Sequence, residues 1–152
     1  MNRLFILRHA KAGQHTSQDH ERPLTEVGQA QALRLGEWFS AQGVAFDAVL
    51  TSSSLRTVET VEGLGLGIGF TIVPRLYSAP MHVIEAVVRE SGIESGTILV
   101  VAHNPGVSEL AAQAGHVGAL ATCAVVELGV PGDFTDFSAS ECSIISSYRP
   151  EV

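Results

Sequence analysis

The chain has 152 residues, of which 45% are hydrophobic and 16% are charged, and its net charge at pH 7 is −7. This length favours one domain, and the high apolar content excludes an intrinsically disordered chain. The acidic balance argues against nucleic acids and anionic membranes as partners, because both carry negative charge. We therefore predict a single domain over residues 1–152.

No segment has the composition of a signal peptide or a membrane span. The first apolar run, Leu4–Leu7, is too short for the hydrophobic part of a signal peptide, and no run approaches the roughly 18 apolar residues of a spanning helix. Cys123 and Cys142 have no partner at a metal-binding spacing, so we expect two reduced thiols in or near the core. The expectation is a cytoplasmic protein, and its oligomeric state stays open.

Strands and helices are predicted to alternate along most of the chain. The run Leu4–Leu7 predicts a buried strand, a polar loop over residues 10–24 follows, and Thr25 is a good N-cap for a helix over Glu26–Ala41. Further strands are predicted over Phe46–Leu50, Phe70–Val73, Thr97–Ala102, Thr122–Leu128 and Ser143–Arg149, and further helices over Leu55–Leu64, Met81–Ser91 and Val107–Ala114. This alternation predicts an α/β fold with a mostly parallel central sheet and helices on both faces.

Polar side chains directly follow three of the predicted strands. Arg8 and His9 follow the first strand, Arg56 lies one turn into the helix after the second, and His103 follows the most hydrophobic strand. Ligand sites of open α/β sheets lie at the carboxyl ends of the strands. If these strands are parallel neighbours, two arginines and two histidines share one site.

This combination of residue types suits a phosphoryl group. Arginine binds phosphate oxygens with two parallel N–H groups and stays charged at any working pH. A neutral imidazole can attack phosphorus and hold the phosphoryl group covalently, and nearby guanidinium charges favour that neutral form. Fixed cations can supply the electrostatic stabilisation that a metal ion supplies elsewhere, so we expect no metal and no other cofactor.

Four segments, in this order along the chain, also resemble the motifs of a known family. Leu7–Ala10, Pro23–Gly28, Ser52–Thr60 and Val101–Gly106 are similar to the R-H-G, L-T-x-x-G, S-P-x-x-R-x-x-[EQ]-T and second-histidine motifs of the histidine phosphatase superfamily, also called phosphoglycerate mutase-like. The short chain, alanine in place of glycine at position 10, and the His-Asn-Pro-Gly turn at 103–106 resemble its SixA-like branch. One departure is Ser53, which stands where the family usually has proline and is expected to change loop stiffness.

The resemblance implies a fold and a set of roles. The fold would be a three-layer sandwich of the phosphoglycerate mutase type. His9 would be the phosphorylated nucleophile, and Arg8, Arg56 and His103 would form the phosphate pocket around it. The SixA-like branch implies a phosphatase that removes phosphate from phosphohistidine, with a phosphohistidine-bearing signalling protein as a possible partner.

Other polar residues are weaker candidates. Lys11 and Arg22 of the first loop are predicted to contact the phosphate or the molecule that carries it. Glu85 is the candidate for a general acid, although its spacing also fits a solvated helix face. Other histidines are predicted on the surface and two aromatic residues in packing: His15, His20, His82, His116, Trp38 and Tyr77.

Two other functions remain open at this point. A small-molecule phosphatase or mutase would need a proton donor for its alkoxide leaving group and a lid, and neither is evident, whereas an imidazole leaving group can depart already protonated. A non-catalytic phosphate-recognition module would be expected to lack one of the four pocket residues, and all four are present.

Overall fold

The computed structural model describes residues 2–14 and 18–152. Its centre is one six-stranded sheet in the order β3-β2-β4-β1-β5-β6. The strands are β1 (Asn2–Arg8), β2 (Ala48–Thr51), β3 (Thr71–Ile72), β4 (Thr97–Ala102), β5 (Val125–Val130) and β6 (Ser143–Tyr148). Strands β1 to β4 are parallel, whereas β5 runs antiparallel to both β1 and β6.

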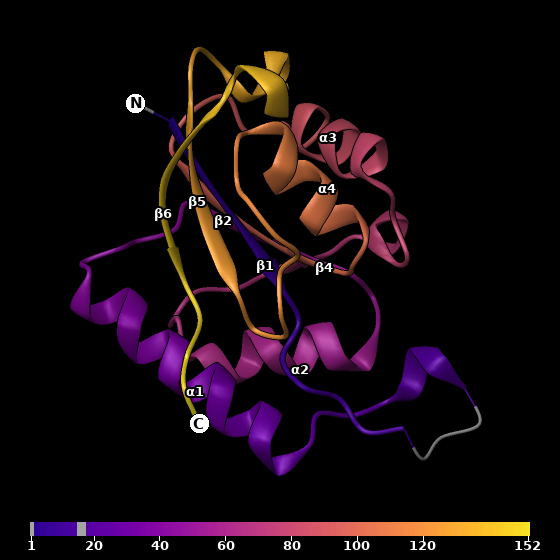
Figure 1. The fold of residues 1–152 in the computed structure, drawn as a ribbon. Helices are drawn as coiled ribbons and strands as arrows, with labels where there is room; N and C mark the ends of the chain where they lie inside the picture. The colour runs from indigo at the N-terminus through magenta and orange to yellow at the C-terminus, as the bar shows by residue number, and fades with distance from the viewer. Residues whose placement is uncertain (1, 15–17) are drawn as a thin grey trace.

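Helices cover both faces of this sheet. Helices α1 (Glu26–Ala41) and α2 (Leu55–Leu64) lie on one face, and α3 (Met81–Arg89) and α4 (Gly106–Gln113) lie on the other (Figure 1). Short 3-10 turns complete the fold at Asp19–Glu21, Pro74–Leu76, Phe134–Asp136 and Ala139–Glu141. The prediction of a three-layer α/β fold with a mostly parallel sheet is confirmed.

The alternation of side chains along β1 explains why the sheet is buried on both faces. Leu4 and Ile6 belong to the core under α3 and α4, whereas Phe5 and Leu7 belong to the core under α1 and α2. Side chains of successive strand residues point to opposite faces, so a continuous apolar run is suited to a central strand. Cys123 and Cys142 are free thiols in these cores, as expected.

Several helices and strands begin or end at other residues than the sequence predicted. The helix expected over Met81–Ser91 ends at Arg89, and the strand expected over Phe70–Val73 shortens to an exposed pair of residues. The strand expected over Thr122–Leu128 instead covers Val125–Val130, because Cys123 adopts a left-handed φ of 61° that breaks the extended conformation. Among the described residues, no helix is both long and apolar enough to cross a membrane.

Gly28 allows the segment after β1 to cross closely over the first turn of α1. A Cβ atom at this position would lie 2.1 Å from the carbonyl oxygen of Lys11, which is backbone and cannot rotate away. That same carbonyl accepts the backbone N–H of Thr25 at 3.0 Å. Glycine is therefore required at position 28, in the second motif, by this close backbone approach. The approach fixes the path of the backbone after β1.

We predict that Gly28→Ala lowers the free energy of unfolding by about 1–3 kcal/mol, because the backbone of residue 11 must shift to admit a methyl group. Urea denaturation measures this change. Gly69→Ala is the control, since nothing lies within 4 Å of a Cβ there and its φ is not left-handed; it should be neutral or slightly stabilising. Equal stability of the two variants would contradict the prediction.

Candidate active site

The register of the sheet brings the three polar strand ends to one place. Arg8 lies opposite Ala102 in the β1–β4 pair, and Thr51 lies opposite Val101 in the β2–β4 pair. The residues that follow these ends therefore emerge at the same edge of the sheet. The ring centroids of His9 and His103 are 5.4 Å apart, so the expected convergence occurs.

His9 is buried, and only one of its two ring nitrogens has a partner among the described residues. Its Nδ1 lies 2.7 Å from the carbonyl oxygen of Ala10, which can only accept, so Nδ1 carries the proton and Nε2 keeps its lone pair. Burial is the largest cause that lowers the pKa of His9 to about 4; the Ala10 bond opposes it, and the charges of Arg56 and Arg8 add to it. His9 is thus neutral at pH 7, with the lone pair on Nε2.

His103 is held in the opposite tautomer. Its Nδ1 lies 3.4 Å from Nη2 of Arg56, which always donates, and its Nε2 lies 2.8 Å from Oγ of Ser52. The proton of His103 therefore sits on Nε2 and is donated to the serine. Burial first, and then the neighbouring His9 and Arg56, lower the pKa of His103 to about 3.

Arg8 and Arg56 each have a buried N–H group that finds no acceptor in the described part of the chain. Nη1 and Nη2 of Arg56 donate to the backbone oxygen and to Oδ2 of Asp19, at 2.8 and 3.1 Å, and Nη1 of Arg8 donates to the carbonyl of Leu120 at 3.2 Å. In the described part of the chain, however, Nε of Arg8 and Nε of Arg56 are buried with no partner. A buried unsatisfied donor costs about 1–3 kcal/mol, so two of them beside His9 indicate that an anion supplies the missing acceptors.

The motif segments are tied to one another at the site. The hydroxyl of Thr60 accepts the backbone N–H of Ala10 at 3.0 Å, and the carboxylate of Glu59 accepts the backbone N–H of Leu24 at 2.9 Å. Helix α2 thereby holds the backbone on both sides of the first loop. The spacing of the third motif is explained by these contacts together with Arg56.

Asp19 is a site residue that the sequence did not single out. Its carboxylate accepts from Tyr77 at 2.5 Å, from Arg22 at 2.8 Å and from Arg56 at 3.1 Å. The hydrogen bond from Tyr77, followed by that from Arg22, holds the pKa of Asp19 far below its usual range. Asp19 is therefore ionised at any working pH and connects the first loop to the arginine of the pocket.

Two aromatic residues lie closer to the site than the sequence predicted. His20, expected on the surface, lies 2.9 Å from Oγ of Ser53 through Nε2 and packs edge-on against Tyr77. Tyr77, expected in packing, faces His103 with ring centroids 5.6 Å apart and bonds Asp19. Proline at position 53 has no hydroxyl and could not make this contact with His20. Serine in place of the family's usual proline therefore adds one hydrogen bond between the first loop and the start of α2.

Arg22 and Lys11, which were predicted to contact the phosphate, differ in where they lie. Arg22 donates to the carbonyl of Gly13 and to Asp19, so it braces the loop, while its charge still contributes to lowering the pKa of His9. Lys11 is exposed and lines a separate hollow of about 390 Å³ with Arg149. Lys11 is thus not among the buried groups around His9.

Glu85 does not reach the pocket. Its carboxylate accepts the backbone N–H of Ala139 at 3.0 Å, on a 3-10 turn outside the site. The expectation that Glu85 is a general acid is therefore wrong.

As expected, His82 is exposed and Trp38 serves packing by stacking on Tyr148. His116 is only half-buried, and His15 falls outside the described residues. No group of three His, Cys, Asp or Glu side chains in the described chain is placed to hold a metal ion.

The two neutral histidines predict how stability depends on pH. Their folded pKa values, about 4 and about 3, lie below the ordinary value of roughly 6.5, so the unfolded chain binds more protons below that pH. The free energy of unfolding should be constant above about pH 6.5 and fall towards pH 4, by up to about 1.4 kcal/mol per pH unit for each histidine. Asp19 contributes only below this window, because its folded pKa is depressed and its unfolded value is near 3.8.

Urea denaturation between pH 7 and pH 4 measures this dependence. His82→Gln, at an exposed position, should leave the slope unchanged, whereas His9→Gln should reduce it. A flat profile between pH 6.5 and 4 for the unsubstituted protein would contradict the pKa values.

Comparison with known proteins agrees with this geometry. The family model described as the histidine phosphatase superfamily (branch 1) matches residues 4–85. An uncharacterized protein of Mycobacterium tuberculosis (strain CDC 1551 / Oshkosh) is 39% identical over 107 residues, which cover 69% of this chain and 67% of that protein. Phosphohistidine phosphatase SixA of Escherichia coli (strain K12) is 29% identical over 116 residues, which cover 72% of each protein.

A solved structure matches nearly the whole chain. The structure of a candidate phosphohistidine phosphatase SixA from Nakamurella multipartitia superposes with a TM-score of 0.89 at 26% identity, and the match covers 99% of this chain and 97% of that one. The similarity thus extends beyond residue 85, where the family match ends, to the strands β4, β5 and β6.

Proposed function

Because the chain belongs to the histidine phosphatase superfamily, we propose that it is a phosphatase that works through a phosphohistidine intermediate on His9, with phosphohistidine of a signalling protein as its substrate. One observation carries this proposal. Among the described residues, Nε2 of His9 keeps its lone pair, and the two arginines whose charges act on His9, Arg8 and Arg56, each have a buried Nε–H group without an acceptor. A phosphoryl oxyanion bound between them would supply the acceptors that both arginines lack.

In the first step, Nε2 of His9 attacks phosphorus and forms a P–N bond. The bond between phosphorus and the nitrogen of the substrate imidazole breaks, and the leaving imidazole departs carrying a proton. Arg8 and Arg56 stabilise the charge on the equatorial oxygens, and the low pKa of His9 keeps the attacking nitrogen unprotonated.

In the second step, water attacks the phosphoryl group on His9. The P–N bond to His9 breaks, inorganic phosphate forms, and the imidazole returns to its neutral state. The bond from Nδ1 to Ala10 persists through both steps and keeps Nε2 aligned with phosphorus.

The carboxylates near the site support a phosphoramidate substrate over a phosphoester. Asp19 is held ionised by Tyr77 and Arg22, and Glu85 is bound to Ala139, so neither supplies a proton in the described structure. An alkoxide leaving group requires a proton donor, whereas the imidazole of phosphohistidine leaves already protonated. The similarity to phosphohistidine phosphatase SixA of Escherichia coli supports the same choice.

A substrate panel tests the proposal. The protein is incubated with a phosphohistidine-bearing protein, with p-nitrophenyl phosphate and with phosphoserine, and kcat/KM is measured for each. We expect the highest value for phosphohistidine, and an acid-labile, alkali-stable phosphate on the enzyme after a rapid quench. Equal or faster turnover of the phosphoesters would favour a small-molecule phosphatase, and phosphate binding without turnover or phospho-enzyme would favour a recognition module.

A further inference from the structure

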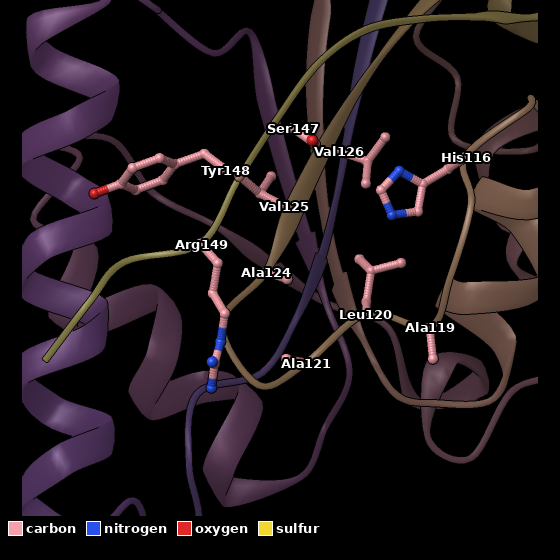
Figure 2. Close-up of a pocket in the computed structure, with 10 residues that line it drawn as sticks. All are labelled: His116, Ala119, Leu120, Ala121, Ala124, Val125, Val126, Ser147, Tyr148 and Arg149. Carbon is pink, nitrogen blue, oxygen red and sulfur yellow. The ribbon is translucent and has the colours of Figure 1, made fainter.

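The segment 119–124 wraps around the Arg8–His9 pair. The carbonyl of Ala124 accepts the backbone N–H of Arg8 at 3.1 Å, and the backbone N–H of Cys123 donates to the carbonyl of His9 at 2.9 Å. The carbonyl of Leu120 accepts from Nη1 of Arg8 at 3.2 Å. Figure 2 shows Leu120, Ala121 and Ala124 along this segment, on the side that faces a hollow of about 280 Å³. The segment therefore holds both the backbone and the guanidinium of Arg8.

Leu120 is itself held by two side chains, one from Asn104 just before α4 and one from Ser108 in its first turn. Nδ2 of Asn104 donates to the carbonyl of Leu120 at 2.8 Å, and Oγ of Ser108 accepts the backbone N–H of Leu120 at 2.9 Å. Oγ of Ser108 in turn donates to Oδ1 of Asn104 at 2.5 Å. The two side chains and the peptide groups of Leu120 form a closed ring of hydrogen bonds.

Capping of α4 does not account for this ring. The N-cap residue of α4 is Pro105, and it makes no side-chain cap hydrogen bond. The amide oxygen of Asn104 is bound to a side-chain hydroxyl and its amide nitrogen to Leu120, so neither atom serves the first turn of the helix. The ring is directed at Leu120.

Arg8 needs a fixed acceptor because its neighbours repel it. Burial is the first cause that lowers the pKa of Arg8, and the charges of Arg149 and Arg56 are the next. Its Nε has no partner among the described residues, so the Leu120 carbonyl is the contact that sets the direction of the guanidinium. Displacing this carbonyl would turn the N–H groups of Arg8 away from the oxyanion.

We propose that Asn104 and Ser108 are positioning residues that act on the phosphoryl group through Leu120 and Arg8. The proposal rests on the proposed function, since it takes Arg8 as a ligand of the phosphoryl group. The ring of hydrogen bonds fixes the carbonyl of Leu120, and this carbonyl fixes the guanidinium of Arg8. The guanidinium is thereby oriented to bind the oxyanion before the substrate arrives. Asn104, the residue after His103, is thus linked to Arg8, the residue before His9.

Ser108→Ala tests this link, with Ser91→Ala as the matched control. Ser91 also makes two local hydrogen bonds through a half-buried hydroxyl, to the carbonyl of Val88 and from the N–H of Ile93, but it lies just beyond the C-terminal end of α3. The dissociation constant for inorganic phosphate, measured by calorimetry, should rise about fivefold in Ser108→Ala and stay unchanged in Ser91→Ala. KM should rise by a similar factor with little change in kcat, because Arg8 contacts the phosphoryl group in both the ground and the transition state.

A double-mutant cycle separates positioning from a merely structural role. In an Arg8→Ala background, Ser108→Ala should have almost no effect on phosphate affinity, since the group on which it acts is gone. Ser108→Thr, which keeps the hydroxyl, should restore the affinity. The same fivefold loss with and without Arg8, or equal affinities of Ser108→Ala and Ser91→Ala, overturns the positioning role while the parent enzyme remains active. If the parent neither binds phosphate nor forms a phospho-enzyme, the proposed function fails and this role fails with it.

Discussion

Replacing His9 with alanine is expected to lower kcat/KM for a phosphohistidine substrate by roughly 10⁴-fold or more and to abolish the acid-labile phosphate on the enzyme. The reason is chemical: the covalent step needs a nucleophilic nitrogen at this position. His103 cannot take over, because the proton on its Nε2 is committed to Ser52 and its Nδ1 faces Arg56. Steady-state kinetics and quench-trapped labelling with ³²P measure the two effects.

Phosphate binding separates lost chemistry from lost structure in this variant. Arg8 and Arg56 remain in His9→Ala, so inorganic phosphate should still bind, within a few-fold of the parent affinity. His82→Ala, at an exposed position, is the control and should keep full activity. Undiminished turnover by His9→Ala would refute the covalent mechanism outright.

Arg56→Lys is expected to lower kcat/KM by about 10²–10³-fold although the charge is kept. The guanidinium of Arg56 serves the backbone oxygen and carboxylate of Asp19 together with Nδ1 of His103, and it keeps Nε for the anion. A single ammonium group cannot occupy all these directions at once. The loss should therefore include a loosened first loop as well as weaker binding of the phosphoryl group.

Kinetics and limited proteolysis of the first loop measure these two parts of the Arg56→Lys effect. Arg75→Lys is the matched control, because Arg75 makes an exposed ion pair with Glu90 at 3.0 Å and should tolerate the change. If Arg56→Lys kept activity within threefold of the parent, the guanidinium geometry would not matter and the pocket assignment would be wrong.

The sequence predicted the parts of the site that follow from strand ends and motif spacing. Arg8, His9 and His103 directly follow apolar runs, and Arg56 lies at a fixed distance into a capped helix, so local pattern places them together. Asp19 and Tyr77 come from irregular segments in which no periodicity constrains a side chain. Their meeting depends on how the first loop and the turn at Pro74–Leu76 pack across α2, which a single sequence does not encode locally.

The misplaced fifth strand has a similar origin. The run from Thr122 is apolar enough to extend β5, and apolar content alone cannot decide where pairing begins. Tertiary hydrogen bonds decide it: Cys123 turns to meet the carbonyls of Arg8 and His9, and regular pairing starts at Val125. Residues removed from the strand, Cys123 and Ala124, are bonded to the backbone of Arg8 and His9.

The carboxylate of Asp19 changes the charge balance of the pocket. Three guanidinium groups, those of Arg8, Arg22 and Arg56, act on His9, and Asp19 offsets one of them. The charge of Arg149 also acts on Arg8, so an excess of positive charge remains after Asp19 is counted, and this excess favours an anionic ligand. A pocket without this acid would retain the product by Coulomb attraction, because charges a few ångströms apart in a low-dielectric site interact strongly. If the proposed hydrolysis is the reaction, we expect Asp19 to favour release of inorganic phosphate, the event that ends each turnover.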